Sequence, residues 1–133
     1  MADNLFEVKI ITPEREFYTG QVTMIEFNTT EGEIGVYKNH IPLTVVLAPG
    51  IVTLTEENDA KTAAVHAGFA EILGDQVTIL AEIAEWPNEI NVKRAKEAEE
   101  RARQRIEAKT GDIDLVRAEI ALKKSLVRQQ VAS

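Results

Sequence analysis

The chain contains no cysteine among its 133 residues. Disulfides, thiolate nucleophiles and thiolate metal ligands are therefore excluded, and a cysteine-free chain fits the reducing cytosol. No stretch approaches the roughly 18 consecutive apolar residues that a membrane-spanning helix needs, so we expect no transmembrane segment. The residues from Met1 to Asn4 also lack the basic start and the apolar run of a signal peptide.

Side chains that support catalysis are equally scarce. The chain has two serines, Ser125 and Ser133, and two histidines, His40 and His66. Their positions match neither a nucleophile with its base nor a zinc site. The glycines form no phosphate-binding motif, and the carboxylates are scattered as on a solvated acidic surface. We therefore expect no catalytic residues, no metal site and no enzyme activity from the chain alone.

What the sequence does contain is an uneven distribution of charge. Residues 1–87 carry four basic and fourteen acidic side chains, and residues 88–133 carry eleven basic and eight acidic ones, so −10 and +3 sum to the overall −7. Two interpretations stay open. The basic segment contacts the acidic body or an acidic partner, or its Lys and Arg side chains only keep it soluble. Binding to nucleic acid is disfavoured because the acidic body would repel phosphates.

The N-terminal part, residues 1–87, alternates apolar and polar side chains with the period of a β-strand. Phe6, Val8 and Ile10 show this alternation clearly, and Trp86-Pro87 ends the pattern. Many short strands separated by turns predict an all-β sandwich domain. Strands are expected near residues 6–10, 45–47, 51–55, 62–73 and 76–84, with a strand group at 17–29 and a turn-rich stretch at 31–35.

The C-terminal part, residues 88–133, is predicted to form an antiparallel two-helix hairpin. A first helix is expected from Ile90 to Ala108; Gly111 then interrupts the helical pattern, and Asp112 can cap the second helix. Each helix has only a narrow apolar stripe, so the hairpin should be weakly stable alone and should depend on a surface on which it docks. The stripes are Ala95, Ala98, Ala102 and Ile106 in the first helix, and Leu115, Ala118, Leu122 and Leu126 in the second.

One segment resembles a known family. Residues 31–43, with the sequence EGEIGVYKNHIPL, resemble the EGE(L/I)G…HxPL signature of the ε subunit of bacterial F-type ATP synthases. Further similarities follow in the family's order at 68–72 (GFAEI), 77–81 (VTILA), 111–114 (GDID) and 117–122 (RAEIAL), so the resemblance covers nearly the whole chain. One departure is Lys38-Asn39, where the family commonly has Pro-Gly, and it is expected to alter only a turn.

The resemblance implies a non-catalytic rotor subunit of the proton-translocating ATP synthase. In this family the β-sandwich binds the γ subunit at the foot of the central stalk and rests on the membrane c-ring. The protein would then lie on the cytoplasmic face of the cell membrane as a peripheral part of the complex. Glu33 and His40 match the c-ring contact, and for His40 a histidine that only fixes its own turn is the alternative.

The resemblance also implies that the hairpin is regulatory. In the family it either folds onto the sandwich or extends along γ, where its basic residues meet an acidic surface of the catalytic β (and α) subunits and block ATP hydrolysis. A ligand or a partner can bias such a bistable element. The residues expected to make the inhibitory contact are Arg105, Arg117, Lys123, Lys124 and Arg128.

Some bacillus-type members of the family bind ATP on the folded hairpin through an I(L)DxxRA motif. The matching stretch is 90–95, INVKRA, in which Asn91 caps a helix as well as aspartate does but supplies no charged acceptor. Lys124 replaces an arginine, so a point charge replaces a planar fork. We expect no required cofactor and weak or absent ATP binding; the alternative is a capped helix with solvated basic residues. The candidate ATP-binding residues are Glu85, Ile90, Asn91, Arg94, Ala95, Arg101, Lys124 and Arg128.

Two other functions are alternatives to a rotor subunit. A free-standing adaptor would bind one protein through the sandwich and another through the hairpin, and co-purification with a membrane ATPase would exclude it. A small hydrolase is disfavoured because serine and histidine are so few. An activity screen of the isolated chain would test the hydrolase.

Overall fold

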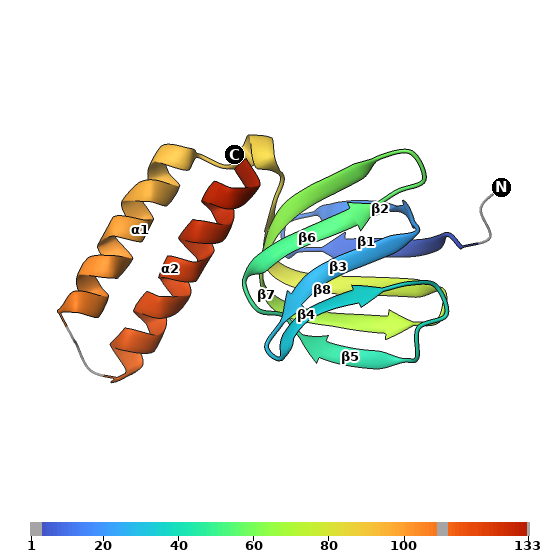
Figure 1. Ribbon diagram of the computed structural model, residues 1–133, viewed down its shortest axis with the longest axis horizontal. Coiled ribbons are helices and arrows are strands. Elements are labelled where there is room, and N and C mark those ends of the chain that lie inside the picture. Colours follow the sequence, from blue (N-terminus) through green and yellow to red (C-terminus); the bar gives the residue numbers. More distant parts are fainter. Residues whose placement is uncertain (1–3, 109–111, 133) are drawn as a thin grey trace.

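The computed structural model describes residues 4–108 and 112–132, and within these it gives only the backbone of Asp112 and Ile113. It consists of a β-sandwich followed by a two-helix hairpin (Figure 1). The fold class predicted from the sequence is therefore confirmed. The described helices include none that is long and apolar enough to cross a membrane.

The sandwich is built from one continuous sheet that folds over on itself. Its strand order is β2-β1-β8-β7-β6-β3-β4, and β5 pairs with β7 beside this path. The fold depends on the long strand β7, whose first half pairs with β6 and whose second half pairs with β5. The strands are β1 Phe6–Ile11, β2 Glu16–Val22, β3 Met24–Thr29, β4 Gly32–Val36, β5 Leu43–Val46, β6 Gly50–Thr55, β7 Ala60–Leu73 and β8 Gln76–Glu85.

The stretch 31–35, expected to be turn-rich, is mostly strand β4. Ile34 pairs with Phe27 and Val36 pairs with Ile25 across an antiparallel ladder to β3. The prediction was wrong because two glycines hid a short alternation: Val36 is buried and Ile34 packs on the core, while Gly35 faces outward. The expected strand group at 17–29 consists of two strands, β2 and β3, with Thr23 between them.

A local distortion in the middle of β7 changes which side chains face the core. His66 pairs with Ile83 and Gly68 pairs with Ala81, so the register with β8 is the same on both sides of Ala67, which itself is unpaired. Ala67 and Gly68 have positive φ, 58° and 117°. The core-facing positions shift from odd to even numbers across these two residues. Before them the buried core residues are Ala63 and Val65, and after them they are Ala70 and Ile72.

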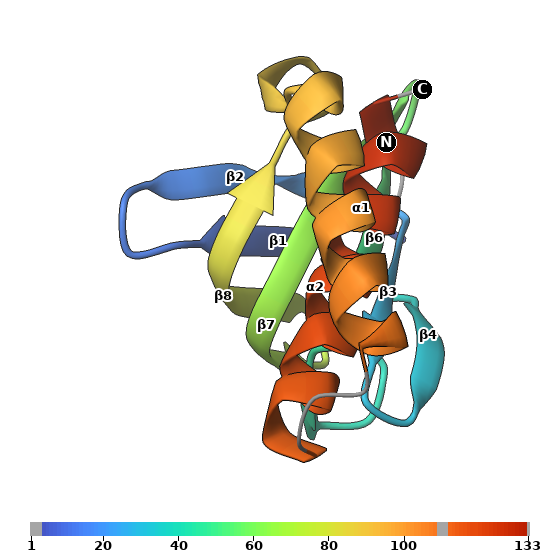
Figure 2. The same cartoon turned by 90° about the vertical axis from the view of Figure 1, so that its left-hand side faces the viewer.

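The hairpin follows a short 3-10 turn, η1 Pro87–Glu89, and consists of α1 Val92–Glu107 and α2 Asp112–Ala132. Asn91 caps α1, because its side-chain oxygen accepts a hydrogen bond from the Arg94 backbone N–H at 3.1 Å. The expected interruption at Gly111 lies outside the described residues. Figure 1 shows α2 between α1 and the sandwich, and Figure 2 shows the same layers from the hairpin side.

Helix α2 therefore has two inner faces. One faces α1: Gln129 donates a hydrogen bond to Glu99 of α1 at 2.8 Å, and Ala118 and Ser125 are buried on the same side of α2. On the other, Val127 and Val131 are buried against the sheet. The predicted stripe is wrong at its last member, because Leu126 is 41% exposed and Ser125 takes the inner position. At 100° per residue, position 125 stays closer to the line through Ala118 than position 126 does. The Ser125 hydroxyl donates to the Leu122 carbonyl at 2.7 Å, so its burial leaves no hydroxyl unpaired.

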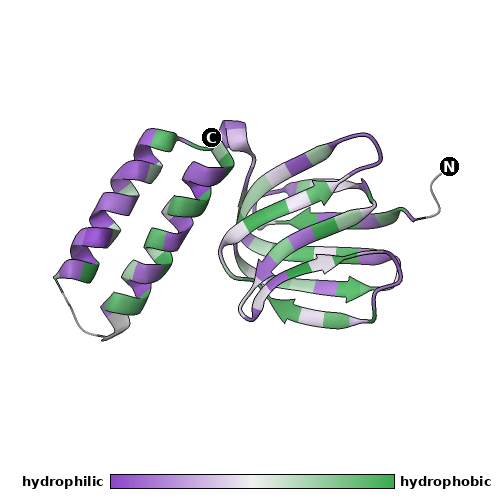
Figure 3. Ribbon diagram, in the orientation of Figure 1, coloured by the Kyte–Doolittle hydropathy of each residue, from purple (hydrophilic) through white to green (hydrophobic). Residues whose placement is uncertain are grey.

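The contact between hairpin and sandwich is small. Its apolar part consists of Ala64, Val127 and Val131, with Ile51 and Ile90 packed beside them. Figure 3 shows that the outer helix α1 is largely hydrophilic. Burying an aliphatic side chain fully contributes about 1.5–3 kcal/mol, so this cluster holds the hairpin by only a few kcal/mol after the cost of ordering is subtracted.

Candidate functional site

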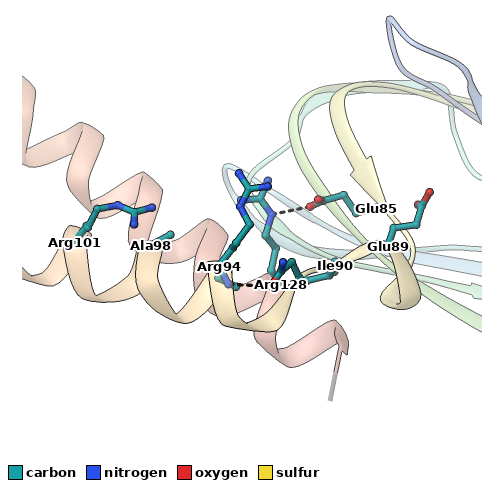
Figure 4. Close-up of a pocket in the computed structure, with 9 residues that line it drawn as sticks. Glu85, Glu89, Ile90, Arg94, Ala98, Arg101 and Arg128 are labelled. Atoms are coloured by element: carbon teal, nitrogen blue, oxygen red, sulfur yellow. Dashed lines mark hydrogen bonds and ion pairs between the residues drawn. The ribbon is translucent and has the colours of Figure 1, made fainter.

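A polar cavity of about 250 Å³ lies where β8, η1 and the hairpin meet. Figure 4 shows its side chains converging from the end of β8, from the start of α1 and from the last turns of α2. The sequence brings them together because Pro87 ends the sheet and Asn91 starts α1 only a few residues later. The cavity is lined by Glu85, Glu89, Ile90, Asn91, Arg94, Ala95, Ala98, Arg101 and Arg128.

The two carboxylates of the cavity are already paired. Glu85 Oε1 accepts a hydrogen bond from Arg128 Nε at 2.7 Å, and Glu89 Oε1 accepts one from Arg15 Nη2, also at 2.7 Å. Within residues 4–108 and 112–132, Arg94 and Arg101 have no ion-pair partner. Two uncompensated guanidinium groups facing one cavity suit an anionic ligand, because arginine donates in the fork geometry that phosphate accepts.

The ionisation of both glutamates follows from these contacts. The His66 ring beside Glu85, followed by the Arg128 guanidinium, lowers the pKa of the Glu85 carboxyl. Arg15 and the backbone N–H of Trp86 lower the pKa of Glu89 in the same way. Both carboxylates are therefore charged at neutral pH, and the cavity presents fixed charges of both signs.

Seven of the eight predicted ATP-binding residues line this one cavity; the exception is Lys124. Lys124 is half-buried on α2, one turn before Arg128, and its charge acts on His66. Two residues that line the cavity, Glu89 and Ala98, are not among the ATP-binding residues predicted from the sequence. Glu89 lies in the η1 turn just before the motif. Ala98 lies one helical turn beyond Arg94 on α1, so the helical spacing from Arg94 could have identified it.

The two residues predicted to contact the c-ring lie in different elements. Glu33 is exposed in β4 and lines a groove beside Lys123 of α2. His40 lies in the loop between β4 and β5, and its Nδ1 is 2.7 Å from the Ile41 carbonyl oxygen, a contact within the loop. Tyr37 and Ile41 of the same loop are 63% and 73% exposed. This loop, more than Glu33, offers an apolar tip to a partner.

The five predicted inhibitory residues divide into two groups. Lys124 and Arg128 are half-buried against the sandwich, where Arg128 pairs with Glu85. The other three, Arg105, Arg117 and Lys123, are exposed on the hairpin. In the described, docked arrangement only part of the basic surface is therefore available to an acidic partner.

A row of exposed apolar side chains crosses three strands on the outer face of the sheet. Val46 of β5 pairs with Phe69 of β7, and Phe69 pairs with Leu80 of β8. They are 57%, 44% and 38% exposed. Paired neighbours on one face of a sheet form a continuous surface, and exposed apolar surface of this kind commonly marks a protein–protein contact.

Comparison with protein families gives two matches that together cover the chain from residue 5. Residues 5–87 match the beta-sandwich domain of the ATP synthase Delta/Epsilon chain, and residues 88–133 match its long alpha-helix domain. The ATP synthase epsilon chain of Caldanaerobacter subterraneus is 42% identical over 132 residues, which is 98% of this chain and 96% of the relative. That of Halalkalibacterium halodurans is 44% identical over 126 residues, 94% of this chain and 95% of the relative.

Two solved structures share the fold. A chain in the mitochondrial ATP synthase of Euglena gracilis, an OSCP/F1/c-ring structure, superposes with a TM-score of 0.85 at 23% identity, covering 100% of this chain and 84% of that one. A chain in the central stalk and c-ring of the Tetrahymena thermophila enzyme gives a TM-score of 0.64 at 15% identity, covering 96% of both chains. These likenesses concern the fold.

Proposed function

Because the chain belongs to the ATP synthase Delta/Epsilon chain family, we propose that it is a non-catalytic rotor subunit in the central stalk of an F-type ATP synthase. The observation that carries the proposal is its 42% and 44% identity to bacterial ATP synthase epsilon chains over almost its whole length. Full-length similarity to a subunit of one complex favours this role over a free-standing adaptor. In this role the protein is peripheral, on the cytoplasmic face of the membrane.

Two surfaces of the sandwich are the proposed contacts with the rest of the rotor. The apolar row Val46–Phe69–Leu80 is suited to the γ subunit, because a lasting interface buries an apolar centre. The loop that carries His40, with its exposed Tyr37 and Ile41, is suited to the c-ring together with Glu33. The apolar row and the loop that carries His40 are separate from the cluster of Ala64, Val127 and Val131 that docks the hairpin, whereas Glu33 borders the docked hairpin beside Lys123.

The c-ring contact predicts a specific cross-link. The chain has no native cysteine, so His40→Cys and Glu33→Cys each introduce a single thiol. We expect each thiol to form a disulfide with a cysteine in the polar loop of the ring in assembled membranes, whereas Glu57→Cys, in the exposed β6–β7 turn, should not. Immunoblotting of the oxidised complex measures this. A coupled enzyme in which neither thiol cross-links, or in which Glu57→Cys cross-links as well, would contradict the placement.

The hairpin is the proposed regulatory element. Its docking contact is small, and two of its five basic inhibitory candidates, Lys124 and Arg128, face the sandwich when it is docked. Extension of the hairpin along γ would release these two charges and present all five to an acidic surface of the catalytic β (and α) subunits. The extended hairpin then blocks rotation in the direction of ATP hydrolysis.

The cavity at the base of the hairpin is the proposed site of nucleotide sensing. It is formed jointly by Glu85 of the sandwich and by Arg94, Arg101 and Arg128 of the two helices. A ligand held there binds only the docked state and stabilises it by RT ln(1 + [L]/Kd). Ligand pockets commonly have volumes of about 300–1,000 Å³. At about 250 Å³ this cavity would leave part of ATP in solvent, which supports weak binding.

The nucleotide site predicts a selective loss of affinity. Arg94→Ala should weaken ATP binding by about ten- to a hundredfold, the equivalent of one lost charged hydrogen bond of roughly 1.5–3 kcal/mol. Arg103→Ala is the matched control, because Arg103 is on the same helix but faces outward in a pair with Glu99. Titration calorimetry on the whole chain measures both. Equal affinities of the two variants would show that ATP does not use this cavity.

The same titration tests the two departures from the bacillus-type motif. Asn91→Asp places a carboxylate in the cavity wall and is expected to strengthen binding. Lys124→Arg is expected to change affinity less, because Lys124 is outside the cavity lining.

A further inference from the structure

His66 is fully buried although it lies on the outer face of the sheet. Ala63 and Val65 belong to the sandwich core, so the alternation of β7 turns Ala64 and His66 outward. There α2 covers them: Ala64 packs on Val127, and the His66 side chain is 0% exposed. The burial of His66 thus depends on the docked hairpin.

The buried ring has poor partners. In the part of the chain that is described, neither ring nitrogen makes a hydrogen bond. The nearest counter-charge is Glu85 Oε1, 3.7 Å from Nε2, and this oxygen already accepts the hydrogen bond of Arg128. A polar ring buried without partners costs free energy, and an unpaired buried charge costs considerably more.

The charged groups that act on His66 come from two elements. β8 contributes Glu85, and α2 contributes Arg128 and Lys124. The nearby Glu89 of η1 is paired with Arg15, α1 directs Arg94 towards the cavity, and the neighbouring strands β5 and β6 contain no ionisable residue. Burial lowers the pKa of His66; Glu85 opposes this, and Arg128 and Lys124 lower the pKa further.

We propose that His66 is a proton-sensitive latch for the hairpin, whose protonation releases α2 from the sandwich. The proposal rests on the proposed function in that the hairpin must have an undocked state. A protonated ring beneath α2 would be a buried cation beside two others, with a carboxylate that is already paired. Undocking removes both α2 cations and exposes the ring to water, which solvates its charge.

The direction of the pH effect follows from proton linkage. The undocked state binds the additional proton, so docking is strongest above the ordinary histidine pKa of 6.5 and weakens as the pH falls below it. One proton is involved, so the ratio of undocked to docked hairpins should rise by up to about tenfold between pH 7.5 and 5.5. Glu85, with its lowered pKa, stays charged in this window and would weaken docking only at lower pH.

Two neighbouring alanines provide a probe and its control. Ala64 and Ala63 are both 0% exposed, but Ala64 is covered by the hairpin and Ala63 by the sandwich core. In the full chain, Ala64→Cys therefore reports undocking, and Ala63→Cys reports opening of the sandwich. The reaction of each thiol with 4,4′-dithiodipyridine is measured at pH 7.5 and 5.5 and divided by the rate of the exposed Glu119→Cys at the same pH.

We expect the normalised rate at position 64 to exceed that at position 63 and to rise by up to about tenfold at the lower pH. Adding His66→Gln, which keeps a polar side chain but does not titrate there, should abolish the rise, and adding His40→Gln in the exposed loop should leave it unchanged. NMR titration of the parent chain should give His66 a pKa below 6.5.

Failure of the latch and failure of the mobile hairpin give different results. If position 64 reacts faster than position 63 but equally at both pH values, or if the rise persists with His66→Gln, the hairpin opens and the latch is wrong. A His66 pKa at or above 6.5 in the parent chain would also overturn the latch. If position 64 reacts no faster than position 63 at either pH, the hairpin does not undock by itself and both proposals fail.

Discussion

Deletion of residues 88–133 is expected to raise the ATP hydrolysis rate of the assembled complex while leaving the complex intact. The described part of the sandwich has its own core of twenty buried residues and keeps both proposed rotor surfaces, so its attachment should not depend on the hairpin. If the hairpin blocks nine complexes in ten before deletion, hydrolysis should rise about tenfold. The steady-state hydrolysis rate of purified complexes, with subunit content checked on the same samples, measures this.

A charge variant tests whether the basic side chains, and not the presence of the hairpin alone, inhibit ATP hydrolysis. Replacing the three exposed candidates, Arg105, Arg117 and Lys123, with glutamine leaves the docked contacts of Lys124 and Arg128 unchanged. Each exposed pair contributes about 0–1 kcal/mol, so the triple variant should release part of the inhibition. The matched control replaces two exposed cations at the start of α1, Lys93 and Lys96. Hydrolysis at the parent rate after complete deletion would contradict an inhibitory hairpin.

Gly68→Ala is expected to destabilise the sandwich by about 3 kcal/mol or more, which lowers Tm by roughly 10–15 °C. A Cβ at this position would lie 2.0 Å from the Leu80 carbonyl oxygen and 2.9 Å from the Ala81 Cα. Both are backbone atoms of the paired strand β8, which cannot move without breaking the ladder. The φ of 117° adds backbone strain for any residue with a side chain.

The control for this substitution is Gly74→Ala in the turn between β7 and β8. An added Cβ there meets no described atom within 4 Å, and the φ of Gly74 is not among the positive ones. Its stability should stay within about 0.5 kcal/mol of the parent. Urea unfolding followed by circular dichroism compares the three proteins. Equal midpoints for Gly68→Ala and the parent would show that the β7 backbone at Gly68 is not constrained by β8.

The sequence predicted the elements whose pattern is long and regular. The alternation at Phe6, Val8 and Ile10 identified β1, and the glycine-free run with its cap at Asn91 identified α1. Seven cavity residues were also found from sequence, through the resemblance of one motif and the positions that accompany it. Local pattern suffices when each residue's partner is a near neighbour in the chain.

Features that depend on contacts between distant segments were missed. Strand β4 is hard to recognise from Gly32–Val36 alone, because its alternation is visible only beside its partner β3. Leu126 is exposed because the sheet covers the other side of α2. The spacing of apolar residues along one helix does not show where the sheet lies. From the sequence, His66 is a candidate only for a catalytic base or a zinc ligand. The burial of His66 requires that β7 turn this side chain to the outer face of the sheet and that α2 dock there. Both conditions are met only in the folded protein.

The most direct test of a mobile inhibitory hairpin is the distance between two spin labels in the assembled complex. Glu57→Cys in the sandwich and Glu119→Cys on α2 are exposed, and the chain has no other thiol. We predict a docked distance in actively hydrolysing complexes and a second, longer distance whose fraction rises in step with inhibition. A single docked distance in fully inhibited complexes would contradict the account.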